Sequence, residues 1–413
     1  MRGVLFGSAQ APAGRRGRRG ARRGAAASLA VSALLLAAGC SGGTRGVGQL
    51  PSPSLPSSAA SDSSGSSASP SASTALPPAK GSVTVVSTLT EGLDSPWGLA
   101  ELPGGDLLVS SRDKGTITRI DGKSGKKTLL GTVPGVAPGG EGGLLGLAVS
   151  PTYGADHLVY AYFTTASDNR IARMQYDENG TTPGQLLGAP DTILRGIPKG
   201  SIHNGGRIAF GPDHMLYAGT GETGDTGLAQ DKKSLAGKIL RMTPDGQPLH
   251  GNPEADSVVY SYGHRNVQGL AWDEHKQLWA SEFGQDTWDE LNRIVPGGNY
   301  GWPEVEGKAG KRGFIDPVAQ WKTSEASPSG IAFAEGSIWM AGLRGERLWR
   351  IPLSGRADGE SLAAPQAFLK GKYGRLRTVL AAGGDKLWLV TSNTDTRGTP
   401  RPGDDRILVL AVR

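Results

Sequence analysis

Three polar strings between His203 and Pro303 contain the side chains of this sequence that could carry out chemistry. They are HNGGRIAFGPD from His203, YGHRNVQGLAW from Tyr262 and SEFGQDTWDELNRIVPGGNYGWP from Ser281. Histidine can accept a proton near neutral pH, and arginine can pair with a carboxylate. These groups recur at the edges of short apolar runs, where a chain that needed only a core would have little use for them. The window therefore predicts a functional site.

The elements that must position these groups form a repeat. An apolar strand, a turn and further apolar strands recur in six copies, which begin at Ser95, Leu144, His203, Val267, Pro328 and Arg375. The copies follow one another at about 56 residues, and Gly, Pro and Asp turns bound their short strands. No long segment has a strong helical period. The pattern predicts an all-β fold, a six-bladed β-propeller, with a strand near residues 82–88 closing the last blade.

The propeller would bring distant residues together. Its blades converge on a central axis, so the loops on one face can build a common pocket. In the last copy, alternation along a strand places Arg375 and Arg377 on the same face. A β-sandwich array is the alternative fold, but even spacing without linkers favours the propeller.

The first residues predict export. Seven arginines precede an apolar run from Ala25 to Ala38, and the run ends in LLAAGC at Cys40. A basic region, a short apolar region and small residues before a cleavage point are typical of a signal peptide, here residues 1–39. Cys40 takes the position of the lipidated cysteine in a bacterial lipobox. We therefore expect an exported protein, lipid-anchored at the outer face of the cell membrane.

Residues 40–80 are mostly Ser, Pro, Ala and Gly, which predicts a disordered linker before a folded domain at 81–413. The formal charge of +6 belongs to the leader, because removing its seven arginines leaves about −1. The high pI is thus no evidence for a nucleic-acid partner. With no cysteine after Cys40, the domain has no disulfide, and no Cys/His pattern suits zinc.

Six strings taken together resemble the soluble-type PQQ-dependent aldose sugar dehydrogenases, a glucose/sorbosone dehydrogenase-like family. They are GEGGLLGLAVSP, HNGGRIAFGPD, GTGETGD, GHRNVQGLA, SEFGQDTWDELN and GGNYGWP, in family order. The resemblance runs from Val83 to Val412 and implies a six-bladed propeller. It also implies an oxidoreductase that uses PQQ and calcium to oxidise an aldose sugar at the anomeric carbon to a lactone. Electrons would then pass to a separate acceptor.

The resemblance implies a catalytic pair and a set of cofactor contacts. His203 would be the general base, and Glu222, where some members have aspartate, would orient it. Arg344 stands where the family often has lysine, and the arginine pair of the last copy matches a basic pair around the cofactor carboxylates. The implied PQQ contacts are Arg265, Asn266, Arg344, Arg375 and Arg377.

The same resemblance implies metal sites. In the family, two successive backbone carbonyls hold the calcium that contacts the cofactor, and they map to Gly284 and Gln285. A further calcium site of some members maps to the neighbourhood of Asp289, Glu290 and Tyr300. Oxygen donors of these kinds suit calcium.

Two residues depart from the best-known glucose-oxidising members. Glu141 stands where those members have a glutamine beside the sugar, and Ile202 stands where they have an acid. Both positions lie on the sugar side of the family's pocket. We therefore expect glucose to be a poor substrate and the chain to belong with broader aldose-oxidising members.

Two other functions compete with this hypothesis. One is a calcium-dependent lactone or ester hydrolase on a six-bladed propeller, although the arginine-rich set exceeds what a hydrolase needs. The other is a non-catalytic surface propeller that binds glycans or protein partners. Turnover with PQQ, and lactone hydrolysis without it, distinguish the three.

Overall fold

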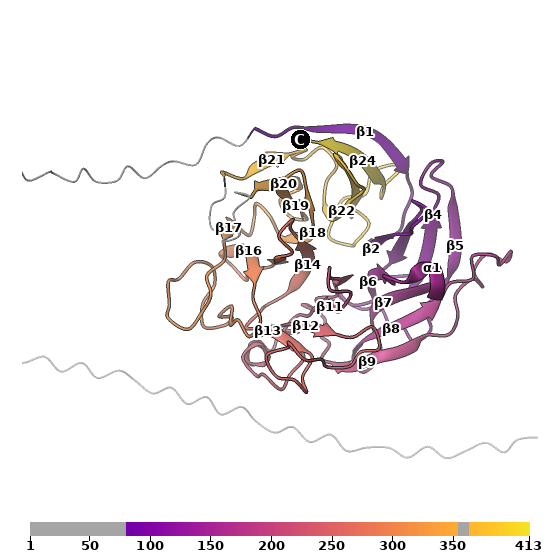
Figure 1. The fold of residues 1–413 in the computed structure, drawn as a ribbon. Coiled ribbons are helices and arrows are strands. Elements are labelled where there is room, and N and C mark those ends of the chain that lie inside the picture. Colours follow the sequence, from indigo (N-terminus) through magenta and orange to yellow (C-terminus); the bar gives the residue numbers. More distant parts are fainter. Residues whose placement is uncertain (1–79, 354–362) are drawn as a thin grey trace, which may run out of the picture. The chain divides into compact units, whose positions relative to one another are not determined.

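The structure is a computed structural model that describes residues 80–353 and 363–413, all within one compact unit. These residues form six four-stranded sheets set around a central axis as the blades of a β-propeller (Figure 1). The predicted fold is confirmed. The described residues contain two short helices, α1 (Tyr153–Asp156) and the 3-10 helix η1 (Thr226–Ala229).

Three predictions concern residues at the start of the chain that the structure does not describe. The signal peptide at 1–39, Cys40 and the linker up to residue 79 lie outside the described residues. Within the part of the chain that the structure describes, no helix combines the length and apolarity needed to cross a bilayer.

Blades 1 to 3 each use four consecutive strands, from the axis outward. Blade 1 contains β2 (Pro96–Glu101), β3 (Leu107–Ser111), β4 (Thr116–Ile120) and β5 (Lys127–Thr132). Blade 2 contains β6 (Leu144–Val149), β7 (Leu158–Thr164), β8 (Asn169–Gln175) and β9 (Asp191–Ile197). Blade 3 contains β10 (Ile208–Phe210), β11 (Leu216–Gly219), β12 (Lys238–Met242) and β13 (Val259–Tyr262).

Blades 4 and 5 repeat this order, and blade 6 joins both ends of the domain. Blade 4 contains β14 (Val267–Trp272), β15 (Leu278–Glu282), β16 (Trp288–Ile294) and β17 (Ala319–Lys322). Blade 5 contains β18 (Pro328–Ala334), β19 (Ser337–Gly342), β20 (Arg347–Pro352) and β21 (Gln366–Phe368). Blade 6 contains β22 (Leu376–Ala381), β23 (Lys386–Thr391), β24 (Ile407–Val412) and β1 (Val83–Thr90).

The ring closes as the sequence predicts, with the first strand at the outer edge of the last blade. β1 pairs antiparallel with β24, from Val83 opposite Val412 to Thr90 opposite Ile407. Figure 1 shows these strands from the two ends of the domain side by side. The added strand completes the fourth position of blade 6 and covers β24, so that the blades keep only short, protected edges.

The core lies between the blades. Six clusters of buried apolar side chains fill the six interfaces between neighbouring sheets. Between blades 5 and 6, for example, Trp339 packs in one cluster with Leu389 and Leu410. Each blade therefore depends on both neighbours to remove its faces from water.

Glycine recurs at one position of the innermost strands because those strands crowd together near the axis. A Cβ on Gly98 would lie 2.5 Å from the carbonyl oxygen of Leu145, and one on Gly269 would lie 2.4 Å from that of Ser329. Gly146 and Gly330 take the same place in blades 2 and 5. In these four blades, a side chain at this position would clash with the backbone of the neighbouring blade.

Blade 3 carries Arg207 at this position, and its side chain fills the axis. The Nε group donates to the carbonyl oxygen of Gln268 at 2.8 Å, and an Nη group donates to Oγ1 of Thr378 at 3.0 Å. The guanidinium also stacks 4.5 Å from the ring centre of Trp97. One side chain thus joins four blades, and burial lowers the pKa of Arg207 to about 9.

Candidate active site

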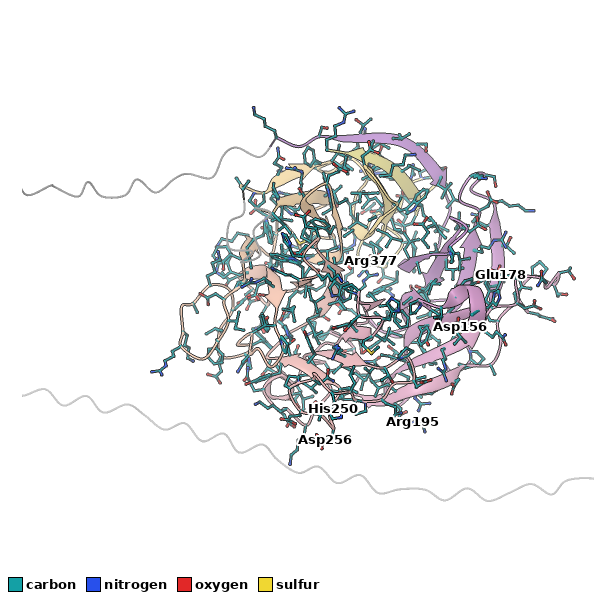
Figure 2. The ribbon with its side chains drawn as sticks, viewed as in Figure 1. Asp156, Glu178, Arg195, His250, Asp256 and Arg377 are labelled. Carbon is teal, nitrogen blue, oxygen red and sulfur yellow. The ribbon has the colours of Figure 1, made fainter. Side chains whose placement is uncertain are left out.

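A cleft of about 540 Å³ opens where the loops of the blades converge on one face. Most of its lining residues come just before the innermost strand of a blade or just after the second strand. In an antiparallel sheet, the start of one strand and the end of the next lie at the same end of the sheet. Figure 2 places Arg377 near the centre of the ring and Asp156, Arg195 and Asp256 at its rim. The lining residues are Trp97, Arg112, Glu141, His203, Arg265, Gln268, Phe283, Gly284, Gln285, Asp289, Thr323, Ser327, Leu343, Arg344, Arg375, Arg377, Asp395 and Arg397.

His203 lies in this cleft with its ring fixed from one side. Its Nδ1 is hydrogen-bonded to Oε1 of Glu222, whose side chain is 1% exposed. The other Glu222 oxygen accepts the backbone N–H of Gly224 at 3.1 Å. Since Nδ1 is engaged by Glu222, Nε2 is the ring nitrogen left to exchange a proton with a molecule in the cleft.

The backbone of His203 is held as firmly as its ring. Its φ of 52° lies in the left-handed region, which is uncommon for a residue other than glycine. The N–H of His203 donates to Oε2 of Glu141 at 2.9 Å, and Oε1 of Glu141 accepts a guanidinium N–H of Arg397 at 2.9 Å. Glu141, which the sequence placed beside the substrate, therefore also anchors the histidine.

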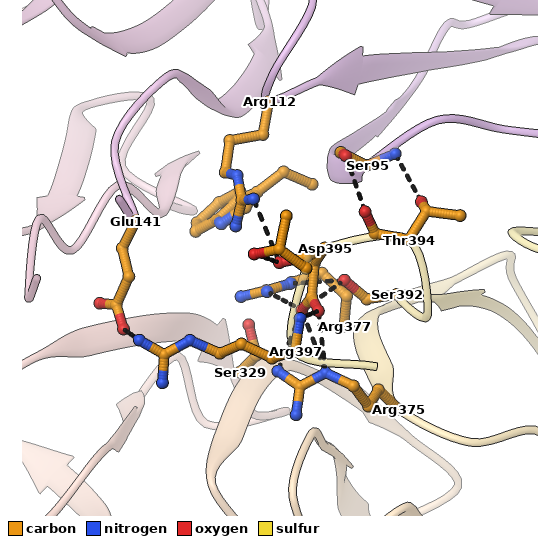
Figure 3. Close-up of polar contacts among 12 residues, drawn as sticks. Ser95, Arg112, Glu141, Ser329, Arg375, Arg377, Ser392, Thr394, Asp395 and Arg397 are labelled. Atoms are coloured by element: carbon orange, nitrogen blue, oxygen red, sulfur yellow. Dashed lines mark hydrogen bonds and ion pairs between the residues drawn. The ribbon is translucent and has the colours of Figure 1, made fainter. Parts of the chain in front are cut away.

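Three arginines converge on Asp395, two on its carboxylate and one on its backbone carbonyl (Figure 3). Arg375 donates from Nε and Nη2 to Asp395 at 3.0 to 3.1 Å, and Arg377 donates from Nη2 to Oδ2 of Asp395 at 3.0 Å. Arg112 donates to the backbone carbonyl of Asp395 at 3.3 Å. Burial raises the pKa of Asp395, but Arg377 and Arg375 outweigh it and lower that pKa overall.

Two further guanidinium groups reach the cleft without a carboxylate partner among the described residues. Arg344 is exposed in the cleft wall. The guanidinium of Arg265 donates a long hydrogen bond, 3.3 Å, to the carbonyl oxygen of Phe283 and lies 5.5 Å from the ring centre of Trp302. The Nε of Arg265 is buried with no hydrogen-bond partner in the described chain. Burial also lowers the pKa of Arg265. The cleft thus has guanidinium groups to spare for an anionic ligand.

Asn266 lies behind the cleft wall. Its side chain is fully buried and accepts the backbone N–H of Gly205 at 3.0 Å through Oδ1. Its Nδ2 has no partner among the described residues, which is a costly state for a buried amide.

A buried polar chain supports Arg265 from below. Glu282 accepts the backbone N–H of Arg265 and contacts Nδ1 of His264 at 2.8 Å. Nε2 of His264 contacts Oγ of Ser261 at 2.8 Å. The side chains have the order of a hydrolase triad, but Ser261 and His264 are 0% exposed, so no substrate reaches them. Their effect is to fix the loop that presents Arg265.

The predicted metal ligands divide into two groups. Gly284, Gln285 and Asp289 line the cleft. Glu290 and Tyr300 do not line the cleft. The carboxylate of Glu290 accepts the N–H of Gly307 at 2.7 Å, and the ring of Tyr300 stacks on that of the buried His264. Burial raises the pKa of Glu290 to about 8. Within the described residues, no group of three or more His, Cys, Asp and Glu side chains could hold a metal ion.

The structure adds residues that the sequence did not single out. Asp395 and Arg397 follow β23, Trp97 is the second residue of β2, and Arg112 follows β3. The sequence did indicate that an acidic partner such as Asp395 is needed, because Arg375 and Arg377 were predicted to share one face of a strand and two neighbouring cations require a counter-charge. The sequence offers many acids for that role, and only the ring geometry selects one of them.

Fold and cleft together define a class: a six-bladed propeller with a histidine–glutamate pair and several spare guanidinium groups at its axis. The family model for Glucose / Sorbosone dehydrogenase matches residues 93–399. The chain belongs to this family, so it is an oxidoreductase, and the resemblance read from its motifs is confirmed.

Solved structures and curated proteins similar to this chain include other sugar dehydrogenases. The PQQ-bound aldose sugar dehydrogenase of Streptomyces coelicolor is 74% identical, with a TM-score of 0.80 over 82% of this chain and 100% of that one. Quinoprotein glucose dehydrogenase B of Acinetobacter calcoaceticus is 30% identical over 60% of this chain and 59% of its own length. Aldose sugar dehydrogenase YliI of Escherichia coli is 32% identical over 60% of this chain and 72% of its own length.

Proposed function

We propose that this protein uses PQQ and calcium to oxidise aldose sugars at the anomeric carbon to lactones, with His203 as the general base. The observation that carries the proposal is the His203–Glu222 pair in the same cleft as Arg265, Arg344 and the Asp395-linked arginines. Membership in a sugar dehydrogenase family and the PQQ-bound relative support it.

The described residues fit PQQ. The cofactor is a flat quinone with three carboxylates, so its site needs several cations. Arg265 and Arg344 have no carboxylate partner among the described residues, and Nε of Arg265 and Nδ2 of Asn266 are buried and unpaired there. The cleft volume of about 540 Å³ lies in the usual range for small-molecule sites. Arg265, Arg344, Arg375 and Arg377 line the cleft and would hold it, while Asn266 lies behind the cleft wall.

The described residues also fit a hard cation at one end of the cleft. Gly284 and Gln285 offer backbone carbonyls, and Asp289 offers a carboxylate. Burial raises the pKa of Asp289 to about 6, and a bound cation would favour its charged form. We assign the calcium that contacts the cofactor to this loop.

The chain's own part in the reaction is to orient the sugar and move one proton. PQQ, when bound, supplies the group that accepts the hydride. Nε2 of His203 takes the proton of the anomeric hydroxyl group, and Glu222 at Nδ1 fixes the ring tautomer and stabilises the imidazolium that forms. Glu141 holds the histidine backbone and, with Arg397, borders the sugar end of the cleft.

The substrate side supports a broad aldose preference rather than a dedicated glucose site. Glu141 is committed to His203 and Arg397, so it offers the sugar a different contact from a free amide. Ile202 is an exposed large apolar residue beside the histidine. An aldose panel with glucose as one member tests this preference.

Reconstitution tests the function. Apo-protein titrated with PQQ and calcium chloride should show a spectral change and then reduce a dye with at least one aldose. Neither a spectral change nor dye reduction with any sugar would reject the proposal.

Substituting His203→Gln separates chemistry from binding. The variant should bind PQQ normally but lose roughly 10²- to 10⁴-fold in kcat, because general-base catalysis contributes about that much. His214→Gln is a matched control that should retain turnover, because His214 is an exposed histidine outside the cleft lining and also has a left-handed backbone, with a φ of 61°. If His203→Gln keeps wild-type kcat, the base is another residue.

The hydrolase alternative finds less support. The buried Ser261–His264–Glu282 chain is closed to substrate, and the described residues hold no cluster of metal-binding carboxylates at the axis. Lactone hydrolysis in the absence of PQQ would restore this alternative.

Export and lipid anchoring through Cys40 remain part of the proposal, and metabolic labelling with a fatty acid in wild type and Cys40→Ala tests them.

A further inference from the structure

Glu306 makes an unusual set of contacts beside the cleft. It lies between β16 and β17, and its Oε1 accepts four successive backbone N–H groups: Gln285 at 2.8 Å, Asp286 at 3.2 Å, Thr287 at 3.0 Å and Trp288 at 3.0 Å. Successive amides that converge on one anion form a concave nest, and hydrogen bonds to a charged acceptor are stronger than neutral ones. One carboxylate therefore organises the whole turn that connects β15 to β16.

The contacts of Glu306 fix the direction of two carbonyl groups. In a planar trans peptide, the N–H of one residue and the C=O of the preceding residue point to opposite sides. Because the amides of Gln285 and Asp286 point at Glu306, the carbonyls of Gly284 and Gln285 point away from it. Both of these residues line the cleft.

The near end of the turn is held by a second carboxylate. Oδ1 of Asp289 accepts the N–H of Gly284 at 3.0 Å, and Oδ2 accepts that of Ser327 at 2.6 Å. The turn folds so tightly that a Cβ on Gly284 would lie 1.8 Å from the carbonyl oxygen of Trp288. Hydrogen bonds within the protein thus fix the backbone of the turn.

We propose that Glu306 is the positioning residue of the calcium site: it aims the carbonyls of Gly284 and Gln285 so that they can bind a divalent cation together. The inference rests on the proposed function, which assigns calcium to this turn. Glu306 acts through the backbone and is not itself a ligand. Carbonyl dipoles that are already aligned spare the cation the cost of reorganising the turn.

The matched pair Glu306→Gln and Glu304→Gln tests the proposal. Both remove one negative charge from the same loop, but Glu304 is exposed, and its ion pair within the described residues is with Lys311, at 3.6 Å. Calcium chloride is titrated into each apo-protein by calorimetry, and amide hydrogen exchange of residues 285–288 is followed without calcium. Glu306→Gln should weaken calcium binding roughly 10- to 100-fold, the range found for residues that orient metal ligands, and should speed exchange of these amides. Glu304→Gln should match wild type in both.

Rescue distinguishes positioning from a general structural role. Excess calcium should restore PQQ binding to Glu306→Gln, while its unfolding temperature without calcium stays near that of Glu304→Gln. Equal calcium affinity in wild type and Glu306→Gln, with PQQ binding intact in both, overturns the role of Glu306 alone. A wild-type protein that binds neither calcium nor PQQ overturns the proposed function and this inference together.

Discussion

At the scale of single residues, the cleft is organised by carboxylates that serve several partners at once. Asp395 holds Arg375 and Arg377, and Glu141 holds both the backbone of His203 and the side chain of Arg397. Such shared acceptors order cationic groups without neutralising all of them. The cleft therefore keeps the net positive charge that an anionic cofactor requires.

Replacing Asp395→Asn tests this balance. The substitution leaves two arginines without their shared counter-charge, and the side chain of Asp395 is only 3% exposed. Breaking a buried ion pair from one side costs about 3 to 5 kcal/mol, so thermal unfolding of the apo-protein should occur at lower temperature. PQQ carboxylates would replace part of the lost charge, so PQQ should raise the unfolding temperature more in the variant than in wild type. Equal shifts in both proteins would contradict this account.

At the scale of single elements, each innermost strand is specialised for close approach to its neighbours. The recurring glycine of β2, β6, β14 and β18 allows the strands to meet near the axis, and blade 3 uses the same position for Arg207. The position thus lacks a side chain in four blades, while in the other two it holds Arg207 and Thr378, which are hydrogen-bonded to each other.

Substituting Gly269→Ala should be costly for this reason. The new Cβ would lie 2.4 Å from the carbonyl oxygen of Ser329, and the backbone there cannot easily move. Overpacking of this kind typically costs about 1 to 3 kcal/mol in the free energy of unfolding. Gly104→Ala is the matched control, since its Cβ would meet nothing within 4 Å. Chemical denaturation of both variants measures the difference, and equal stabilities would refute the crowding argument.

The start of β12 should give blade 3 a pH-dependent stability. Lys238 is fully buried, and its Nζ donates to the carbonyls of Leu228, Ala229 and Ala236 at 2.6 to 3.0 Å. Burial lowers the pKa of Lys238 to about 8 from an ordinary 10.5. Between these values the unfolded chain binds more protons than the folded protein, so this group makes the free energy of unfolding rise with pH.

The variant Lys238→Met tests how much Lys238 contributes to the change of the unfolding free energy with pH. Denaturation of wild type and variant at several values between pH 8 and pH 10.5 should show the difference in unfolding free energy growing with pH. Lys233→Met, at an exposed position in the preceding loop, should leave the wild-type slope unchanged. A constant difference across this range would mean that Lys238 keeps an ordinary pKa in the folded protein.

At the scale of the whole domain, closure of the ring makes six small sheets interdependent. Every hydrophobic cluster lies between two blades, and β1 links the beginning of the domain to β24 at its end. The cleft draws residues from all six blades. Its geometry therefore depends on a closed ring, and a defect at the closure should reach the site.

Deleting β1 tests this dependence. A chain that begins at Glu91 leaves Ile407, Leu408 and Leu410 of β24 without their partner strand. We expect a lower unfolding temperature and weaker PQQ binding, because the cleft residues that follow β23 lose their support. A chain that begins at Lys80 keeps β1 and should behave as the longer protein does. Equal unfolding temperatures for the two shortened chains would show that β1 does not hold the ring.

The sequence by itself determined the architecture and the neighbourhood of the site. Six copies of a short strand pattern are local signals, because strand periodicity and turn residues are set by nearby residues in the chain. The same locality predicted that Arg375 and Arg377 share a face, and the structure brings both to one carboxylate. Family motifs then placed His203 beside Glu222, as observed.

Tertiary structure alone decided which of many polar groups meet across the axis. It chose Asp395 as the common partner of the arginines, turned Glu141 onto the backbone of His203 and placed Asn266 behind the cleft wall. It also turned Glu290 inward and directed Glu306 at four amides of a distant turn. Some of these contacts join different blades and others join loops of one blade, but all of them depend on how the strands fold back and pack, and no local pattern in a sequence records distances between separate segments.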